Sequence, residues 1–180
     1  TRLMNTTSYL SDIFEGDFPV SQGFGDDPQY YIQFGLAGHE GVDFATPVGT
    51  TALAPFDGIV LREGIDIPGY HNYGLVTVVW DPVQKCAVWF GHLSEEYVSV
   101  GEKVKKGWAI GRTGNTGNTS GPHLHLGFVK TDAYGNRLNV NNGYLGFLDA
   151  LNPLIVTWKL GSGTPPPNAD EYVKRAEEAA

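Results

Sequence analysis

Hydrophobic and polar residues alternate along the chain in short runs, and each run is bounded by glycine, proline, asparagine or aspartate. Clear runs cover residues 51–61, 74–80 and 86–93, which are rich in valine, leucine and aromatic residues. Alternation with a period of two places apolar side chains on one face of an extended strand, and β-branched and aromatic residues favour strands. Turn residues between the runs favour tight connections. The pattern therefore predicts a mostly β domain with mainly antiparallel strands.

Three parts of the chain differ in character. Residues 1–17 form a polar N-terminal lead-in whose weak apolar pattern fits either a short helix or an extended segment. Residues 18–158 carry the strand patterns and are predicted to form the domain. Residues 159–180 are predicted to form a Gly- and Pro-rich linker and a short charged helical tail from Ala169 to Ala180, capped by Asn168. We expect such a tail to connect the domain to another part of a larger protein.

Composition and charge narrow the range of partners. Apolar residues make up 41% of the 180 residues, which is enough to bury a core without disulfides, and the single Cys86 cannot form an internal one. The formal net charge of -8 argues against a nucleic-acid partner, because phosphate binding needs clustered lysine and arginine. The sequence shows no apolar run long enough to cross a bilayer and no signal peptide, so we expect no membrane insertion.

One stretch, Gly121-Pro122-His123-Leu124-His125-Leu126, combines a turn with a His-x-His pattern. On a strand, His123 and His125 would share one face, while Leu124, Leu126 and Phe128 would fill the other. Taken alone, the pattern also fits an exposed strand face that carries two solvated histidines. Other parts of the chain have to decide between these interpretations.

A second polar pair occurs in Gly38-His39-Glu40-Gly41-Val42-Asp43-Phe44-Ala45. A helix would place His39 and Asp43 one turn apart, but its two glycines would each cost about 1 kcal/mol relative to alanine. A strand fits better and would place His39, Gly41 and Asp43 on one face. His92 is expected at the end of the apolar strand Cys86–Leu93. By contrast, His71 lies in a turn-like segment, and we leave it out of the site.

Histidine and aspartate are common metal ligands, so five residues are candidates for a metal site: His39, Asp43, His92, His123 and His125. A catalytic zinc ion takes three protein ligands from histidine and carboxylate and keeps a fourth position open. A closed thiolate site is excluded because the chain has one cysteine. Two polar groups would remain beside the open position and could act as general acid or base. The spacing does not reveal which three residues bind the metal.

Three motifs in this order resemble the lysostaphin/LytM-type zinc metallopeptidases, which cut peptidoglycan cross-links. They are Gly38 to Ala45, Gly91-His92-Leu93-Ser94, and Thr116-Gly117 through His125, and the resemblance covers roughly Phe18 to Pro153. It implies the all-β fold of this family, with a core like a barrel-sandwich hybrid and short peripheral helices. It also implies that Zn2+ is bound by His39, Asp43 and His125, with His92 and His123 as catalytic histidines.

The family also has a tyrosine upstream of the first ligand that contacts the transition state, and Tyr30 and Tyr31 are the candidates here. Four further tyrosines in loops could line a substrate groove or could be ordinary exposed residues: Tyr70, Tyr73, Tyr134 and Tyr144.

The resemblance implies a zinc-dependent endopeptidase that acts on peptidoglycan peptide, outside the cell or in the cell wall. The missing leader and the proline-rich tether would suit a phage lysin, but neither a bacterial nor a phage origin follows from the sequence, and the scissile bond stays open. The alternative is a catalytically silent binding or regulatory module of the same fold, because the pattern over residues 98–111 resembles β modules that dock partners.

Overall fold

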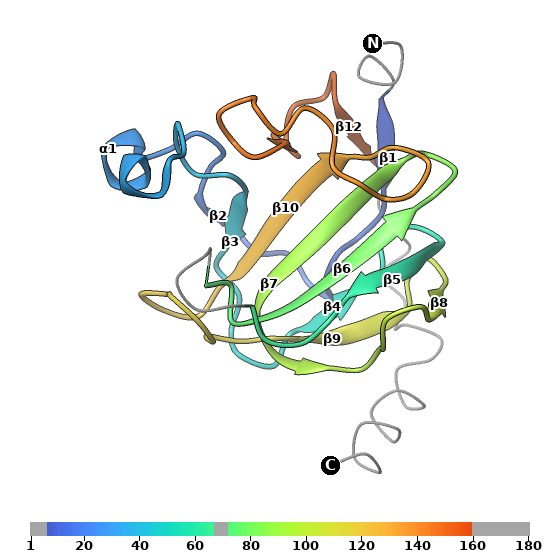
Figure 1. Ribbon diagram of the computed structural model, residues 1–180. Coiled ribbons are helices and arrows are strands. Elements are labelled where there is room, and N and C mark those ends of the chain that lie inside the picture. The colour runs from blue at the N-terminus through green and yellow to red at the C-terminus, as the bar shows by residue number, and fades with distance from the viewer. Residues whose placement is uncertain (1–6, 67–71, 160–180) are drawn as a thin grey trace.

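The computed structural model describes residues 7–66 and 72–159 (Figure 1). The predicted antiparallel β architecture is confirmed, since seven strands follow one another in a hydrogen-bonded path and each pairs antiparallel with its neighbours. In spatial order these are β2 (Val20–Gln22), β3 (Val42–Phe44), β10 (Leu124–Lys130), β7 (Cys86–Glu96), β6 (Leu75–Asp81), β5 (Gly58–Arg62) and β8 (Lys103–Val104).

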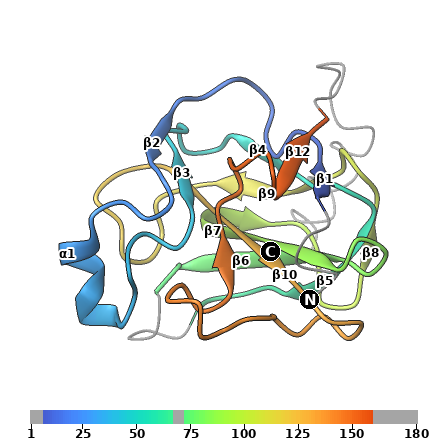
Figure 2. The same cartoon turned by 90° about the horizontal axis from the view of Figure 1, so that it is seen from above.

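Other strands extend this sheet. β4 (Thr51–Leu53) pairs with β9 (Ala109–Thr113), and β9 in turn pairs with the C-terminal part of β7. Seen from above, β4 and β9 lie on one side of β6 and β5 (Figure 2). β11 (Phe147–Leu148) pairs with the far end of β10. The strands therefore enclose a core between two layers.

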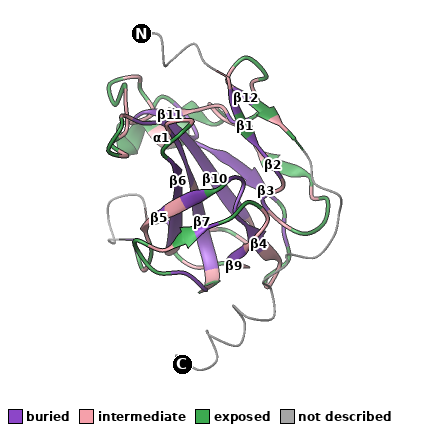
Figure 3. Cartoon of the chain, turned by 90° about the vertical axis from the view of Figure 1, so that its right-hand side faces the viewer, coloured by how far each residue is buried: buried purple, intermediate pink, exposed green. Residues whose placement is uncertain are grey.

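Apolar side chains of the strands fill this core. Leu124, Leu126 and Phe128 of β10 are fully buried and belong to the main apolar cluster, as their alternation with the histidines predicts. The inner strands β10, β7 and β6 are buried along most of their length (Figure 3). Burial of apolar surface on this scale is the main stabilising contribution to such a fold.

The N-terminal segment is extended where the structure describes it. β1 (Ser8–Leu10) pairs in parallel with β12 (Val156–Trp158), so the segment expected as a lead-in forms a small sheet with the last described strand. Leu10 and Ile13 pack into the main core. The predicted tail helix from Ala169 to Ala180 lies outside the described residues.

Among residues 7–66 and 72–159, helical structure is limited to one loop. The short α1 (Pro28–Tyr31) is followed by a 3-10 turn, η2 (Ile32–Phe34), and both precede His39 in the chain. This agrees with the short peripheral helices that the family resemblance implies. In the described part of the chain, no helix has the length and apolar character needed to span a membrane.

Candidate metal centre

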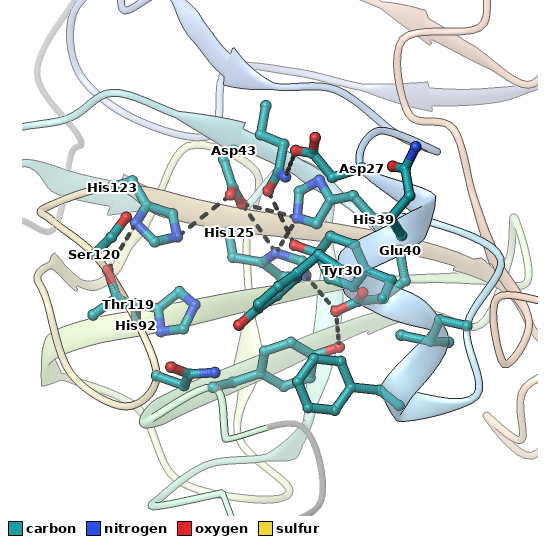
Figure 4. Close-up of a pocket in the computed structure, with 17 residues that line it drawn as sticks. Asp27, Tyr30, His39, Glu40, Asp43, His92, Thr119, Ser120, His123 and His125 are labelled. Carbon is teal, nitrogen blue, oxygen red and sulfur yellow. Dashed lines mark hydrogen bonds and ion pairs between the residues drawn. The ribbon is translucent and has the colours of Figure 1, made fainter.

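Antiparallel pairing of β3 and β10 sets two polar side chains directly opposite each other. Asp43 is the register partner of His125, and His125 in turn lies opposite Gly91 of β7. Residues that face each other across a ladder have their side chains on the same side of the sheet. Both side chains point into one pocket (Figure 4).

His39 reaches the same point from a turn. β3 begins only at Val42, so the expectation that His39 and Gly41 belong to this strand is wrong. The reason is that the backbone N–H of His39 donates to the carbonyl of Asp26 at 2.9 Å, which joins it to the preceding loop. The Nδ1–H of its ring donates to the carbonyl of Gly23 at 3.1 Å. This leaves the Nε2 lone pair facing Asp43 and His125.

Three ligand atoms converge on one point. His39 Nε2 lies 3.3 Å from Asp43 Oδ1 and 3.3 Å from His125 Nδ1, and His125 Nδ1 lies 3.0 Å from Asp43 Oδ1. The donors of a tetrahedral zinc site with bonds of about 2.0 Å lie roughly 3.3 Å apart. Two imidazole nitrogens and one carboxylate oxygen form a common catalytic zinc donor set. These residues therefore fit a zinc ion.

Electrostatics at this point favour a positive charge. Burial alone would raise the pKa of the Asp43 carboxyl, but the close interactions with the rings of His125 and His39 in the metal-free protein outweigh burial and hold the pKa well below its usual range. Burial opposes protonation of His125, yet the hydrogen bond and the charge of Asp43 raise its pKa. Asp43 thus stays ionised and stabilises a proton or a metal cation between these side chains.

Gly41 leaves room for one of the ligands. A Cβ atom at this position would lie 2.6 Å from His125 Cε1 and 2.6 Å from the backbone oxygen of Leu126. Real Cβ contacts are never this short, so only glycine allows the His125 ring to pack here. The glycine between His39 and Asp43 is thus part of the site.

His92 lies at a corner of the sheet, and the expectation that it ends a strand is wrong. It lies inside β7, which pairs with β10 before this residue and with β9 after it. At the point where the partner changes, His92 adopts a φ of +59°, a conformation uncommon outside glycine. Its backbone N–H donates to the carbonyl of Tyr73 at 2.6 Å, which helps to hold this conformation.

The His92 ring is oriented by one hydrogen bond. Nδ1–H donates to the carbonyl of Thr116 at 2.6 Å, so Nε2 carries the lone pair. Burial, together with the neighbouring His125, lowers the pKa of His92 to about 4, although the bond to Thr116 opposes this shift. His92 is therefore a neutral imidazole at neutral pH and can accept a proton at Nε2.

His123 faces the same pocket from just before β10. Its Nδ1–H donates to the carbonyl of Gly121 at 2.8 Å, and its Nε2 lies 3.5 Å from Asp43 Oδ2. The ring lies 4.6 Å from that of His92. Both histidines of the His-x-His pattern thus contact Asp43, and the structure brings all five candidate residues together.

The five residues line a pocket of about 620 Å³. One wall comes from α1 and the segment after it, and the opposite wall from the loop that precedes β10 (Figure 4). Besides the five, the lining residues are Gln22, Asp27, Gln29, Tyr30, Tyr31, Phe34, Leu36, Glu40, Tyr73, Asn118, Thr119 and Ser120. The wall at α1 is polar and aromatic and the wall before β10 is polar, and a pocket with such walls suits a peptide chain.

The two candidate tyrosines differ in their surroundings. The Tyr31 hydroxyl donates to Gln22 Oε1 at 3.0 Å, and Gln22 Nε2 donates to Asp27 Oδ2 at 2.7 Å. Burial and nearby carboxylates raise the pKa of Tyr31, so its hydroxyl stays protonated. Tyr30 is half exposed, and its side chain reaches from α1 into the pocket (Figure 4). His71 lies outside the described residues.

Sequence reasoning missed Glu40, which is buried between His39 and Gly41. The Tyr73 hydroxyl donates to Glu40 Oε1 at 2.8 Å, and Tyr73 is buried and lines the pocket. Burial and the adjacent Glu40 carboxylate raise the pKa of Tyr73 well above its ordinary value, so it remains a donor. The signal available in the sequence was a carboxylate directly after His39, inside the motif that carries two of the candidate metal ligands.

Comparisons with known proteins agree with this geometry. Curated relatives include the glycyl-glycine endopeptidase ALE-1 of Staphylococcus capitis, 34% identical over 143 residues, a match that covers 68% of this chain and 38% of the relative. The peptidoglycan DD-endopeptidase ShyA of Vibrio cholerae is 34% identical over 110 residues, covering 61% of this chain and 24% of the relative. The chain therefore spans well under half the length of these relatives.

Among solved structures, the catalytic domain of lysostaphin from Staphylococcus simulans superposes with a TM-score of 0.60 and 27% identity, covering 76% of this chain and 92% of that domain. A zinc-containing peptidase from Vibrio cholerae gives a TM-score of 0.58 and 25% identity, covering 81% of this chain and 39% of that one. The family model described as "Peptidase family M23" matches residues 37–140, more than half of the 180 residues. The chain belongs to peptidase family M23.

Proposed function

We propose that this domain is the catalytic unit of a zinc-dependent endopeptidase that hydrolyses peptide cross-links or stem peptides of bacterial peptidoglycan. The main support is the triangle of ligand atoms from His39, Asp43 and His125, with His92 and His123 beside it. A binding module would have no use for two oriented histidines next to a metal site. The names of ALE-1 and ShyA refer to two different bonds, so both bond types stay open for this chain.

His39, Asp43 and His125 would hold the zinc ion. When bound, the ion supplies Lewis-acid chemistry, since it polarises a peptide carbonyl and makes a nearby water molecule more acidic. The protein fixes the three ligand atoms by the pairing of β3 with β10 and by the hydrogen bond from His39 to Gly23. Positioning of this kind lowers the entropic cost of reaching the transition state.

His92 would act as the general base. Its neutral ring takes the proton of the attacking water at Nε2, and the Thr116 carbonyl then stabilises the resulting imidazolium through Nδ1–H. In its imidazolium form, His123 would donate from Nε2 to the developing oxyanion or give that proton to the leaving amine, while Gly121 accepts from its Nδ1–H and Asp43 stabilises the positive charge. The short distance between the two rings allows both to reach one scissile bond.

Tyr30 and Tyr31 would border the substrate on the α1 side. The hydroxyl of Tyr31 is already engaged by Gln22, whereas the half-exposed Tyr30 reaches into the pocket (Figure 4). We therefore favour Tyr30 as an additional donor to the oxyanion and Tyr31 as a residue that shapes the wall. Both assignments can be tested separately by removing one hydroxyl at a time.

Peptidoglycan lies outside the cytoplasmic membrane, so the domain would act in the cell wall or outside the cell. Because the chain spans only part of its relatives, we further propose that it works as one module of a larger protein. A role in a phage lysin is one setting in which the same chemistry would operate.

The experiment is digestion of purified cell walls that differ in cross-link type, followed by identification of the new amino termini by mass spectrometry. We expect zinc-loaded protein to release new termini from at least one wall type, chelation to abolish release, and added zinc to restore it. His123→Ala should keep its zinc and lose activity. If the zinc-loaded protein cleaves none of the walls, or if His123→Ala cleaves as well as the wild type, the proposal is wrong and the silent-module alternative gains support.

A further inference from the structure

A buried carboxylate stands directly behind the metal centre. Glu40 is only 5% exposed, and its Oε1 accepts the hydroxyl of Tyr73 at 2.8 Å. Its second oxygen, Oε2, is buried and has no hydrogen-bond partner within the part of the chain that the structure describes. A buried carboxylate oxygen without a partner costs free energy, so its presence calls for an explanation.

A second buried polar atom without a hydrogen-bond partner in the described part of the chain belongs to His125, one of the proposed zinc ligands. His125 Nε2 is buried and also lacks a hydrogen-bond partner among the described residues, and it lies 3.8 Å from Glu40 Oε1 (Figure 4). The other ring nitrogen, Nδ1, faces Asp43 and His39. A neutral imidazole has one N–H, so presenting the Nδ1 lone pair to a metal places the hydrogen on Nε2. The N–H then points at Glu40.

The His125 ring is held in this orientation from two sides. The ring of Tyr73 stacks on it at 4.9 Å between centroids with an interplanar angle of 25°. On another side, Gly41 packs so closely that a Cβ atom there would lie 2.7 Å from Nε2. The ring therefore cannot swing away, and a small approach of the Glu40 carboxylate closes the hydrogen bond.

We propose that Glu40 and Tyr73 are positioning residues of the metal centre, which deepens the proposed function and rests on it. Glu40 accepts the Nε2–H of His125, which fixes the tautomer that offers Nδ1 to the metal and makes the ring more basic. Tyr73 fixes Glu40 through its hydroxyl and fixes His125 through its ring. Carboxylates that accept from a metal-binding histidine typically change metal affinity by about 10- to 100-fold.

The test measures zinc affinity by competition with a chromophoric chelator, using the whole chain. Glu40→Leu removes the acceptor and should weaken zinc binding about 10- to 100-fold. Glu40→Gln keeps an acceptor without the charge and should fall between Glu40→Leu and the wild type. Tyr73→Phe keeps the stacked ring and should have a smaller effect. Glu96→Gln is the matched control, since Glu96 is a carboxylate that accepts from Thr77 and does not line the pocket.

A second measurement separates positioning from general loss of structure. In the zinc-loaded wild type, 15N chemical shifts should show His125 with its proton on Nε2 and its Nδ1 unprotonated, and Glu40→Leu should shift the Nε2–H signal. If folded Glu40→Leu binds zinc as tightly as the wild type, this inference is wrong and the proposed function is unaffected. The same holds if Glu96→Gln loses as much zinc affinity as Glu40→Gln. A wild type that binds zinc but cleaves no wall overturns only the proposed substrate, and a wild type that binds no zinc overturns both proposals.

Discussion

Asp43 and His125 face each other across an antiparallel ladder, and their side chains meet with Oδ1 3.0 Å from Nδ1. The metal centre is therefore built into the sheet, and only His39 comes from a turn. Backbone hydrogen bonds fix the ladder register, so they also fix the separation of these two ligand atoms.

Replacement of Asp43 should abolish metal binding. Asp43→Asn keeps the size of the side chain but removes the charge that both histidines face. We expect zinc affinity to fall by more than about 100-fold, because even residues that only support a ligand typically account for 10- to 100-fold. Competition with a chelator measures the change, and Asp132→Asn, which alters a loop carboxylate that does not line the pocket, should leave zinc affinity unchanged. Equal affinities in the two variants would contradict the assignment.

Gly41→Ala should damage the site through crowding. The new methyl group would collide with the His125 ring and with a backbone oxygen, and overpacking of this kind costs about 1–3 kcal/mol. We expect a lower free energy of unfolding and weaker zinc binding in the same variant. Gly121→Ala is the control, since no atom lies within 4 Å of a Cβ atom at that position. Urea unfolding and chelator competition test both effects, and a Gly41→Ala protein as stable as the control would refute the packing argument.

The stability of the metal-free protein should depend on pH through His92. Burial lowers the pKa of His92 to about 4 in the folded state, whereas an unfolded histidine titrates near 6.5. Between these values the unfolded state binds more protons, so the free energy of unfolding falls as the pH falls from 6.5 to 4. The contribution is at most roughly 3 kcal/mol.

His92→Gln removes this titration. With chelator present, we expect the wild type to lose more stability than His92→Gln between pH 7 and pH 4.5 in urea titrations. Parallel stability curves for the two proteins would show that burial does not suppress protonation of this histidine.

Loss of one tyrosine hydroxyl should distinguish Tyr30 from Tyr31. Removal of a single oxyanion donor typically lowers kcat by about 10²- to 10³-fold. We expect a loss in this range for Tyr30→Phe and a smaller one for Tyr31→Phe, whose hydroxyl is used by Gln22. Tyr134→Phe, at a side chain 84% exposed, should match the wild type. The assignment reverses if Tyr31→Phe shows the larger loss of kcat on cell walls.

Much of the fold follows from local pattern. Alternation in β10 correctly predicts that Leu124, Leu126 and Phe128 pack into the core. The turn residues after β6 correctly predict its short antiparallel connection to β7. Period-two patterning is local and strong in such strands, so it can be read without knowing which strands are neighbours.

Other features depend on contacts between distant segments. No local pattern reveals that His92 takes a positive φ inside a strand, because the conformation follows from the change of partner from β10 to β9. The contact between Glu40 and Tyr73 joins residues 33 positions apart in the chain, so it depends on tertiary structure and not on local pattern. The pairing of β1 with β12 is likewise set by tertiary structure.

The path of β7 has an evolutionary consequence. One strand supplies His92, lies beside the ladder that carries His125, and continues into the second layer. Inserting or deleting one residue in β7 would move every later side chain of the strand to the opposite face of the sheet. Evolution can therefore change this strand by substitution but not in length. New bond preferences would instead have to arise by substitution in the two flanking walls, at α1 and at residues 118–120, whose side chains line the pocket.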